Sequence, residues 1–295
     1  MAEYSLWVLE YATSPRVDMG DIVYGARGQG TRPMPYAYVV LQSRDHVAMV
    51  DVGYNHVDFG ATLAELYDTA HWHGPREVLA LCGLAPEDVD TVFITHAHFD
   101  HFGNVDAFPN ARFYLAAREI ERSVWALSLP ERMQYPAASI DPGDLIKGTA
   151  LARAGRLKLL TGDKEDVLPG IDLHLAPDTH SFESLWVHLR NDGRRPSSDG
   201  WVLAGDLVYA YENIGGTGKG AEAGQAYRPV GFAMGSQVNL VLASEAMLKC
   251  VDYERRRIIP VHEDKLKTMF PSRQREEGLA ITEICLADGA VSRIG

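Results

Sequence analysis

The apolar residues of this chain gather in many short runs bounded by turn-forming residues, a pattern that predicts buried strands. We expect strands at 5–10, 36–41, 47–51, 92–95, 112–115, 157–160, 171–175, 185–189, 201–204, 258–261 and 281–286. Helices are expected at 57–66, 76–81, 118–126 and 237–253, and Asp288-Gly289 is typical of a hairpin turn. This pattern by itself indicates a protein of mixed α and β structure.

An unusual polar cluster directly follows the apolar run that ends at Ile94. It contains His96, His98, Asp100 and His101 in an H-x-H-x-D-H pattern, which rarely arises by chance in a chain with 11 His. In an extended segment, alternate side chains point to the same side, so His96 and His98 can converge on one cation. Asp100 and His101 can then reach a second. Imidazole and carboxylate groups are ligands that Zn²⁺ accepts readily.

Three later residues also follow apolar, strand-like runs. His180 comes after the alternating run at 171–176, Asp206 after the run at 201–204, and His262 after the run at 258–261. Taken singly, each is more often a surface or capping residue than a ligand. Together they supply what the first cluster lacks to close a site for two metal ions.

The order of these motifs resembles that of the metallo-β-lactamase superfamily over nearly the whole chain. The resemblance implies an α+β protein with a four-layer αββα sandwich. It also implies one metal held by His96, His98 and His180, and another held by Asp100, His101 and His262, with Asp206 bridging the two. The early Asp51-Val52-Gly53 turn is similar to a family motif in which the carboxylate supports a ligand without binding the metal.

Within that superfamily, the chain is most similar to N-acyl homoserine lactonases and pyridoxolactonase. Tyr209 stands three residues after Asp206, where lactonases carry a tyrosine that faces the substrate. The alternative is that Tyr209 is an ordinary core aromatic. The chain also departs from the lactonase pattern after His180, where Phe182 and Glu183 replace a small, Gly-containing turn and are expected to reshape the pocket wall.

A Gly-rich segment at 212–228 separates Asp206 from His262. It does not match the phosphate-binding P-loop pattern, because Asn213 occupies the position of the first Gly of that pattern and Gly220 occupies the position of its Ser or Thr. We therefore expect a mobile loop beside the active site, since loops of this length often act as lids.

The resemblance implies a binuclear metal-dependent hydrolase that opens a lactone, with an acyl homoserine lactone as a candidate substrate. A hydroxide bridging two divalent ions would attack the carbonyl carbon, with Zn²⁺ favoured and Fe or Mn as alternatives. Tyr209 would stabilise the oxyanion and Asp100 would carry a proton to the leaving alkoxide. Open alternatives are a cyclic-amide hydrolase, a glyoxalase II-like thioesterase and an iron-dependent oxidoreductase on the same fold. The presence of all seven candidate ligands argues against a binding protein with a decayed site.

Composition supports one enzyme domain over residues 1–295, with 46% hydrophobic residues. A net charge of −12 argues against a nucleic-acid partner and leaves a small-molecule substrate. The apolar run at 6–9 is too short for a signal or membrane helix, so we expect a cytoplasmic protein with no membrane partner. Cys82, Cys250 and Cys285 suggest buried thiols and no disulfide framework. Homo-oligomerisation stays open.

Overall fold

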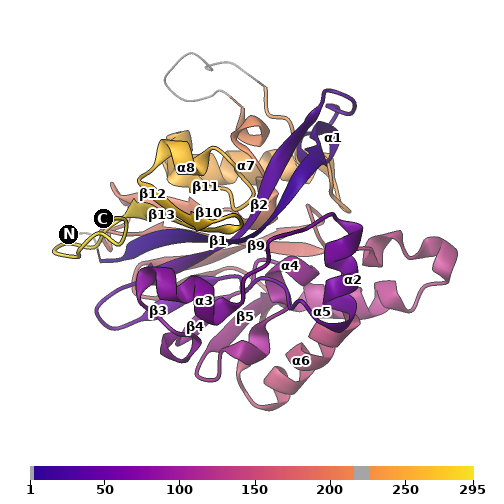
Figure 1. The fold of residues 1–295 in the computed structure, drawn as a ribbon, viewed down its shortest axis with the longest axis horizontal. Helices are drawn as coiled ribbons and strands as arrows, with labels where there is room; N and C mark the ends of the chain where they lie inside the picture. Colours follow the sequence, from indigo (N-terminus) through magenta and orange to yellow (C-terminus); the bar gives the residue numbers. More distant parts are fainter. Residues whose placement is uncertain (1–2, 216–225) are drawn as a thin grey trace.

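The strands of the protein form two sheets that pack face to face in the computed structural model, which describes residues 3–215 and 226–295 (Figure 1). The larger sheet has the order β12-β13-β1-β2-β3-β4-β5-β6, and the smaller has the order β11-β10-β9-β8-β7. The larger sheet consists of β1 (Ser5–Asp18), β2 (Thr31–Gln42), β3 (Val47–Val50), β4 (Thr91–Phe93), β5 (Arg112–Ala116), β6 (Leu157–Leu160), β12 (Ser272–Glu276) and β13 (Leu279–Cys285). The smaller sheet consists of β7 (Lys164–Leu168), β8 (Ile171–Pro177), β9 (Glu183–Arg190), β10 (Gly200–Leu203) and β11 (Ile258–Ile259).

Helices cover both outer faces of this sheet pair, as Figure 1 shows. The helices are α1 (Met19–Ile22), α2 (Asp58–Leu66), α3 (Pro75–Leu79), α4 (Phe99–Phe102), α5 (Ala117–Leu127), α6 (Pro142–Arg153), α7 (Gln237–Cys250) and α8 (Leu266–Met269). Helices α2 to α6 lie on the side of the larger sheet, and α7 contacts β8 and β10 of the smaller sheet. This arrangement confirms the predicted αββα sandwich.

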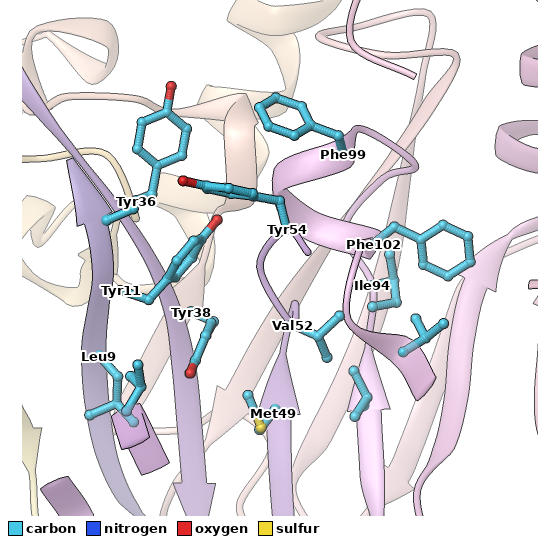
Figure 2. Close-up of a cluster of buried hydrophobic side chains, with 14 of the residues drawn as sticks. Leu9, Tyr11, Tyr36, Tyr38, Met49, Val52, Tyr54, Ile94, Phe99 and Phe102 are labelled. Atoms are coloured by element: carbon cyan, nitrogen blue, oxygen red, sulfur yellow. The ribbon is translucent and has the colours of Figure 1, made fainter. Parts of the chain in front are cut away.

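Alternation along β1 shows how the sequence builds these layers. Trp7 and Leu9 enter the apolar cluster under the helices, whereas Leu6 and Val8 enter the cluster between the two sheets. Side chains alternate across a strand, so a strand buried on both faces is apolar at nearly every position. Figure 2 shows part of the cluster under the helices, where Tyr11 stacks on Tyr38 with ring centroids 5.3 Å apart.

Strand direction brings several turns to one edge of the sandwich. Strands β10 and β11 are parallel, and β8 runs in the same direction because β9 is antiparallel to both β8 and β10. The chain therefore leaves β8, β10 and β11 at the same edge, immediately before His180, Asp206 and His262.

Helix α6 and strands β7 and β12 were not predicted from the sequence. Gly143 and Gly148 lower the helix propensity of α6. The protein needs Gly148, since a Cβ there would lie 2.8 Å from the ring of Phe102. Strand β12 is an exposed edge strand whose residues show no apolar alternation, so its pairing with β13 leaves no hydrophobic pattern.

Two local expectations were wrong. Because Gly103 closely follows the His and Asp cluster, the sequence predicts a loop there, but Asp100 and His101 lie in the single-turn helix α4. The turn at Asp288-Gly289 closes no hairpin, because no strand follows β13 in the described chain. The hairpin near the C-terminus joins β12 to β13 instead, with Gly278 at a φ of 73°.

Two other expectations concern cysteines and membrane spans. Cys82, Cys250 and Cys285 are all unpaired thiols, as predicted, although Cys82 alone is fully buried.

Within residues 3–215 and 226–295, no helix combines the length and the apolarity that crossing a bilayer requires.

Candidate metal centre

Seven buried histidines and aspartates meet at the edge where β8, β10 and β11 end. They form two groups, and within each group one candidate ligand atom per residue lies within 4.8 Å of every other. The first group is His96, His98, His180 and Asp206, and the second is Asp100, His101, Asp206 and His262. The structure thus brings together all seven residues that the sequence singled out, in the two sets that the resemblance implies.

Asp206 belongs to both groups because its two carboxylate oxygens face different sets of imidazoles. Its Oδ2 lies 3.3 Å from Nε2 of His180 and 3.8 Å from Nε2 of His96. Its Oδ1 lies 3.1 Å from Nε2 of His101 and 3.2 Å from Nε2 of His262. A carboxylate in this position can bridge two cations.

Local backbone structure sets the direction of each side chain in the H-x-H-x-D-H run. The segment after β4 is extended, and it leaves Nδ1 of His98 3.1 Å from Nε2 of His180. The turn of α4 then brings Asp100 Oδ2 to 3.3 Å from His101 Nε2. A glycine is required after α4, since a Cβ on Gly103 would lie 2.6 Å from the Tyr54 backbone.

Hydrogen bonds to the opposite ring nitrogen hold three of the histidines. Nδ1 of His180 lies 2.9 Å from the carbonyl oxygen of Phe232, and Nδ1 of His262 lies 2.8 Å from that of Pro35. Nδ1 of His101 lies 2.7 Å from the Asp51 carboxylate. A proton on Nδ1 leaves the free lone pair of the imidazole on Nε2. These contacts therefore leave three Nε2 atoms available as metal ligands that face the centre.

Asp51 is itself held in place by Thr95. The Thr95 backbone N–H and hydroxyl donate to the two Asp51 carboxylate oxygens at 2.7 Å and 2.9 Å. The sequence predicted a supporting role for Asp51 but not the contribution of Thr95. Its position directly before His96, at the end of an apolar run, was the available signal.

The atoms that face this centre fit divalent cations. Nε2 of His96, His101 and His262 and Oδ1 of Asp206 are buried, and none makes a hydrogen bond of good geometry to a described residue. Buried polar atoms without partners are rare in folded proteins. Neutral imidazole nitrogens and carboxylate oxygens, gathered and otherwise unsatisfied, are the donor set that Zn²⁺ and similar ions accept.

The buried carboxylates of the centre also need positive charge beside them. Burial raises the pKa of Asp206, but His101, His262 and His180 outweigh this effect and hold the pKa well below its usual value. Burial lowers the pKa of His101, but the charges of Asp206, Asp100 and Asp51 raise it well above the usual value. A dication among these groups can replace the competing protons, which is why metal binding at such sites depends on pH.

Glu119, in α5, is a buried carboxylate that the sequence analysis missed. Its Oε2 accepts the N–H of Ala97 at 2.9 Å, and its Oε1 accepts the hydroxyl of Ser181 at 2.8 Å and the N–H of Glu183 at 2.5 Å. Glu119 therefore joins the segment of His96 and His98 to the segment that carries His180. Its place on an amphipathic helix resembles that of many exposed glutamates, so the sequence carries no signal for it.

A cavity of about 280 Å³ opens beside the candidate metal centre. Its wall includes His98, Asp100, Asp206 and Tyr209, together with the apolar and aromatic residues Met34, Tyr36, Leu66, Tyr67, Phe99 and Phe232. The Tyr209 ring lies 4.9 Å from the His262 ring and 5.6 Å from the His180 ring, measured between centroids. Tyr209 also packs into the core, so it is a core aromatic that lines the cavity, and its role toward a substrate stays a prediction.

The expectation that Phe182 and Glu183 reshape the pocket wall is wrong. Neither residue is among the described residues that line the cavity. Phe182 lies near Trp125 of α5, and Glu183 begins β9, where it pairs with Pro177. Phe232 and Tyr67 occupy the wall instead.

The Gly-rich segment at 212–228 is described only at its ends, because 216–225 lie outside the described residues. At the first end, Glu212 pairs with Arg32 at 3.3 Å and with Lys265 at 2.6 Å. The expectation of a mobile loop there concerns residues beyond the described part of the chain.

Another group of metal-binding residue types, Asp172, His174 and His188, lies on the smaller sheet. Here the carboxylate of Asp172 already binds two guanidinium groups, Arg190 at 2.9 Å and Arg195 at 2.7 Å. The only carboxylate of the group is already paired with two positively charged side chains, so binding of a metal cation there is disfavoured.

The fold and the two ligand groups define a class of protein, the metal-dependent hydrolases built on an αββα sandwich. The sequence model of the metallo-beta-lactamase superfamily matches residues 30–262. The chain therefore belongs to this superfamily, as the motif order indicated.

Curated relatives align over shorter segments. Metallo-beta-lactamase domain-containing protein 1 of Mus musculus is 37% identical over 75 residues, which are 25% of this chain and 26% of that protein. A protein of Mycobacterium tuberculosis named as a probable metallo-hydrolase is 38% identical over 53 residues, 18% of this chain and 17% of that protein. The chain thus spans about a quarter or less of the length of these relatives.

Solved structures extend the likeness over almost the whole fold. A quorum-quenching N-acyl homoserine lactone lactonase has a TM-score of 0.63 and 18% identity, covering 94% of this chain and 98% of its own. An N-acyl homoserine lactone hydrolase with the product N-hexanoyl-L-homoserine at its catalytic metal centre has a TM-score of 0.63 and 18% identity. The match covers 91% of this chain and 97% of that one. Likeness at this identity establishes a shared fold. Together with the superfamily match, it supports the prediction of a metal-dependent hydrolase that uses divalent metal.

Proposed function

We propose that this chain is a binuclear metal-dependent hydrolase that opens lactone rings. One divalent ion, with Zn²⁺ favoured, is held by His96, His98 and His180. A second is held by Asp100, His101 and His262, and Asp206 bridges both. The observation that carries the proposal is the position of Asp206, whose two oxygens face the two groups of imidazoles separately.

When bound, two such ions supply a water of lowered pKa and a Lewis acid for the carbonyl oxygen. The residues of this chain orient the substrate and handle the proton. Tyr209 lies on the wall of the cavity and can donate its hydroxyl proton in a hydrogen bond to the developing oxyanion. Asp100 lies on the same wall and can carry a proton to the leaving alkoxide oxygen.

The cavity supports a small substrate with an apolar part. Its volume of about 280 Å³ and its wall of Tyr36, Tyr67, Phe99 and Phe232 suit a lactone ring with a short acyl chain. The two structural neighbours named above are enzymes of N-acyl homoserine lactones, which makes a lactone of this kind the first substrate to test.

A hydrolysis screen with measured metal content tests the proposal. The purified protein, loaded with Zn²⁺, Mn²⁺ or Fe²⁺, would be assayed against acyl homoserine lactones, thioesters, lactams and phosphoesters. We expect two metal ions per chain by elemental analysis and the highest kcat/KM on a lactone. One ion per folded chain would overturn the binuclear site, and preference for a thioester or lactam would replace the lactone with that substrate class.

A further inference from the structure

The cavity beside the candidate metal centre has an apolar interior and an acidic mouth. Asp18, Asp21 and Asp68 line it together with the aromatic residues, and Arg16 is the only Lys or Arg among its described lining residues. These carboxylates come from separate parts of the chain. Asp18 and Asp21 lie at helix α1, and Asp68 lies just after α2.

A buried atom on the wall of the same cavity indicates that it receives a ligand. Nε2 of His98 makes no hydrogen bond to a described residue, and His98 is only 3% exposed. His98 lines the cavity together with the three carboxylates, so a molecule bound against His98 lies in the same cavity as they do.

The backbone is fixed at each of the three mouth aspartates. Asp18 caps α1 by accepting the N–H of Gly20 at 2.7 Å, and the carbonyl oxygen of Asp21 accepts the N–H of Phe232 at 2.8 Å. Asp68 has a φ of 51°, a conformation that Asp and Asn tolerate better than most residues. Burial and the neighbouring charge of Asp18 raise the pKa of Asp21 against the opposing charge of Arg27, which indicates that Asp18 and Asp21 repel each other.

We propose that Asp18, Asp21 and Asp68 act as an electrostatic filter that admits uncharged or cationic lactones and disfavours substrates carrying a carboxylate or phosphate. The filter rests on the proposed lactonase function and names the substrate class of the same site. At about 10 Å in water, each unit charge changes the encounter and binding of a charged substrate about twofold at low ionic strength, and less at high salt.

The chemistry of lactone opening suits such a filter. Water adds to the carbonyl carbon, the bond between that carbon and the ring oxygen breaks, and the ring oxygen takes a proton to become a hydroxyl group. The new carboxylic acid loses its proton at neutral pH. An uncharged substrate therefore becomes an anionic product, which the mouth carboxylates repel, so the filter also favours product release.

Three lactones that differ only at the end of the acyl chain test the filter. One ends in a methyl group, one in a carboxylate and one in a quaternary ammonium group. The variants are Asp18→Asn, Asp21→Asn, Asp68→Asn and the triple variant. Asparagine keeps the side-chain shape, and it caps helices about as well as aspartate.

For the metal-loaded wild type at low salt, we expect kcat/KM to be highest for the ammonium lactone and lowest for the carboxylate lactone. Each single variant should raise the ratio of kcat/KM for the carboxylate lactone to kcat/KM for the methyl lactone by about twofold. The triple variant should raise this ratio by about eightfold. The ammonium-to-methyl ratio should fall by similar factors, and high salt should shrink every effect. Inhibition by the hydroxy-acid product should strengthen in the triple variant.

Asp288→Asn is the matched control, because Asp288 is exposed and does not line this cavity. It removes the same charge and should leave both ratios unchanged. Equal ratios in wild type and triple variant, with metal content and melting temperature preserved, would overturn the filter while hydrolysis of the methyl lactone still supports the lactonase. No hydrolysis of any lactone by the metal-loaded wild type would instead overturn the lactonase proposal and the filter with it.

Discussion

The carboxylate of Glu119 binds the backbone N–H of Ala97, the residue between His96 and His98, at a distance of 2.9 Å. Its other oxygen binds Ser181 and Glu183, which follow His180. Glu119 is 1% exposed, so these hydrogen bonds are shielded from water. One buried side chain therefore fixes the relative position of three candidate ligands that come from two distant segments.

Replacing Glu119 with glutamine should weaken metal binding. Gln can keep the two hydrogen bonds of Oε1, but its amide nitrogen would then face the Ala97 N–H, another donor. Loss of a residue that supports metal ligands typically costs about 10- to 100-fold in affinity, and we expect about tenfold here. Chelator competition measures this affinity, and Glu121→Gln, at an exposed position of the same helix, is the matched control. Unchanged metal affinity in Glu119→Gln would contradict the positioning role.

Replacing Asp206 should disturb metal binding more than replacing His262. Asp206→Ala removes a ligand from both groups, whereas His262→Ala removes one from the second group alone. Elemental analysis after dialysis should find close to none of the ions in Asp206→Ala and one retained ion in His262→Ala. Equal metal content in the two variants would show that Asp206 does not bridge.

Replacing Tyr209 with phenylalanine should lower turnover and leave the metal content unchanged. Removing one hydrogen bond to an oxyanion typically costs about 10²–10³ in kcat. We expect a loss nearer tenfold, because a metal ion would share the developing charge. The comparison of kcat with melting temperature decides the role. A variant that melts early but turns over normally would place Tyr209 in the core alone.

Asp144 should make the protein less stable as the pH rises from about 4 to about 7. This residue is 1% exposed, and burial, followed by the charge of Asp141, raises its pKa from 3.8 to about 7. The folded protein then keeps a proton that the unfolded chain releases, so the free energy of unfolding falls across this interval. Asp144→Asn cannot ionise and should be more stable than the wild type at pH 8, by a few kcal/mol at most.

The measurement is denaturant unfolding of both proteins at several pH values, compared as a difference. The Asp144→Asn variant keeps a side-chain oxygen for the Asn55 amide, which donates to Asp144 Oδ1 at 3.2 Å in the wild type. Asp106→Asn is the control, because the exposed Asp106 also pairs with Lys147, at 3.3 Å. A difference between Asp144→Asn and wild type that stays constant with pH would show that Asp144 does not titrate in this range.

The sequence by itself determined the chemistry of the candidate site. His96, His98, Asp100 and His101 lie within six residues, so local backbone geometry alone brings their side chains together. The apolar runs before His180, Asp206 and His262 predicted strands, and the chain does turn at strand ends before each of them. Side-chain type and local periodicity are properties of neighbouring residues, which is why they can be seen in the sequence.

Tertiary structure decided what depends on residues far apart in the chain. The two faces of Asp206, the contacts of Glu119 and the acidic mouth formed by α1 and the end of α2 each join distant segments. Phe182 was expected in the pocket wall because it follows His180, but packing near Trp125 directs it away and Phe232 takes that place. Such contacts are set by how the two sheets and their helices pack, and the order of residues along the chain carries no local signal for them.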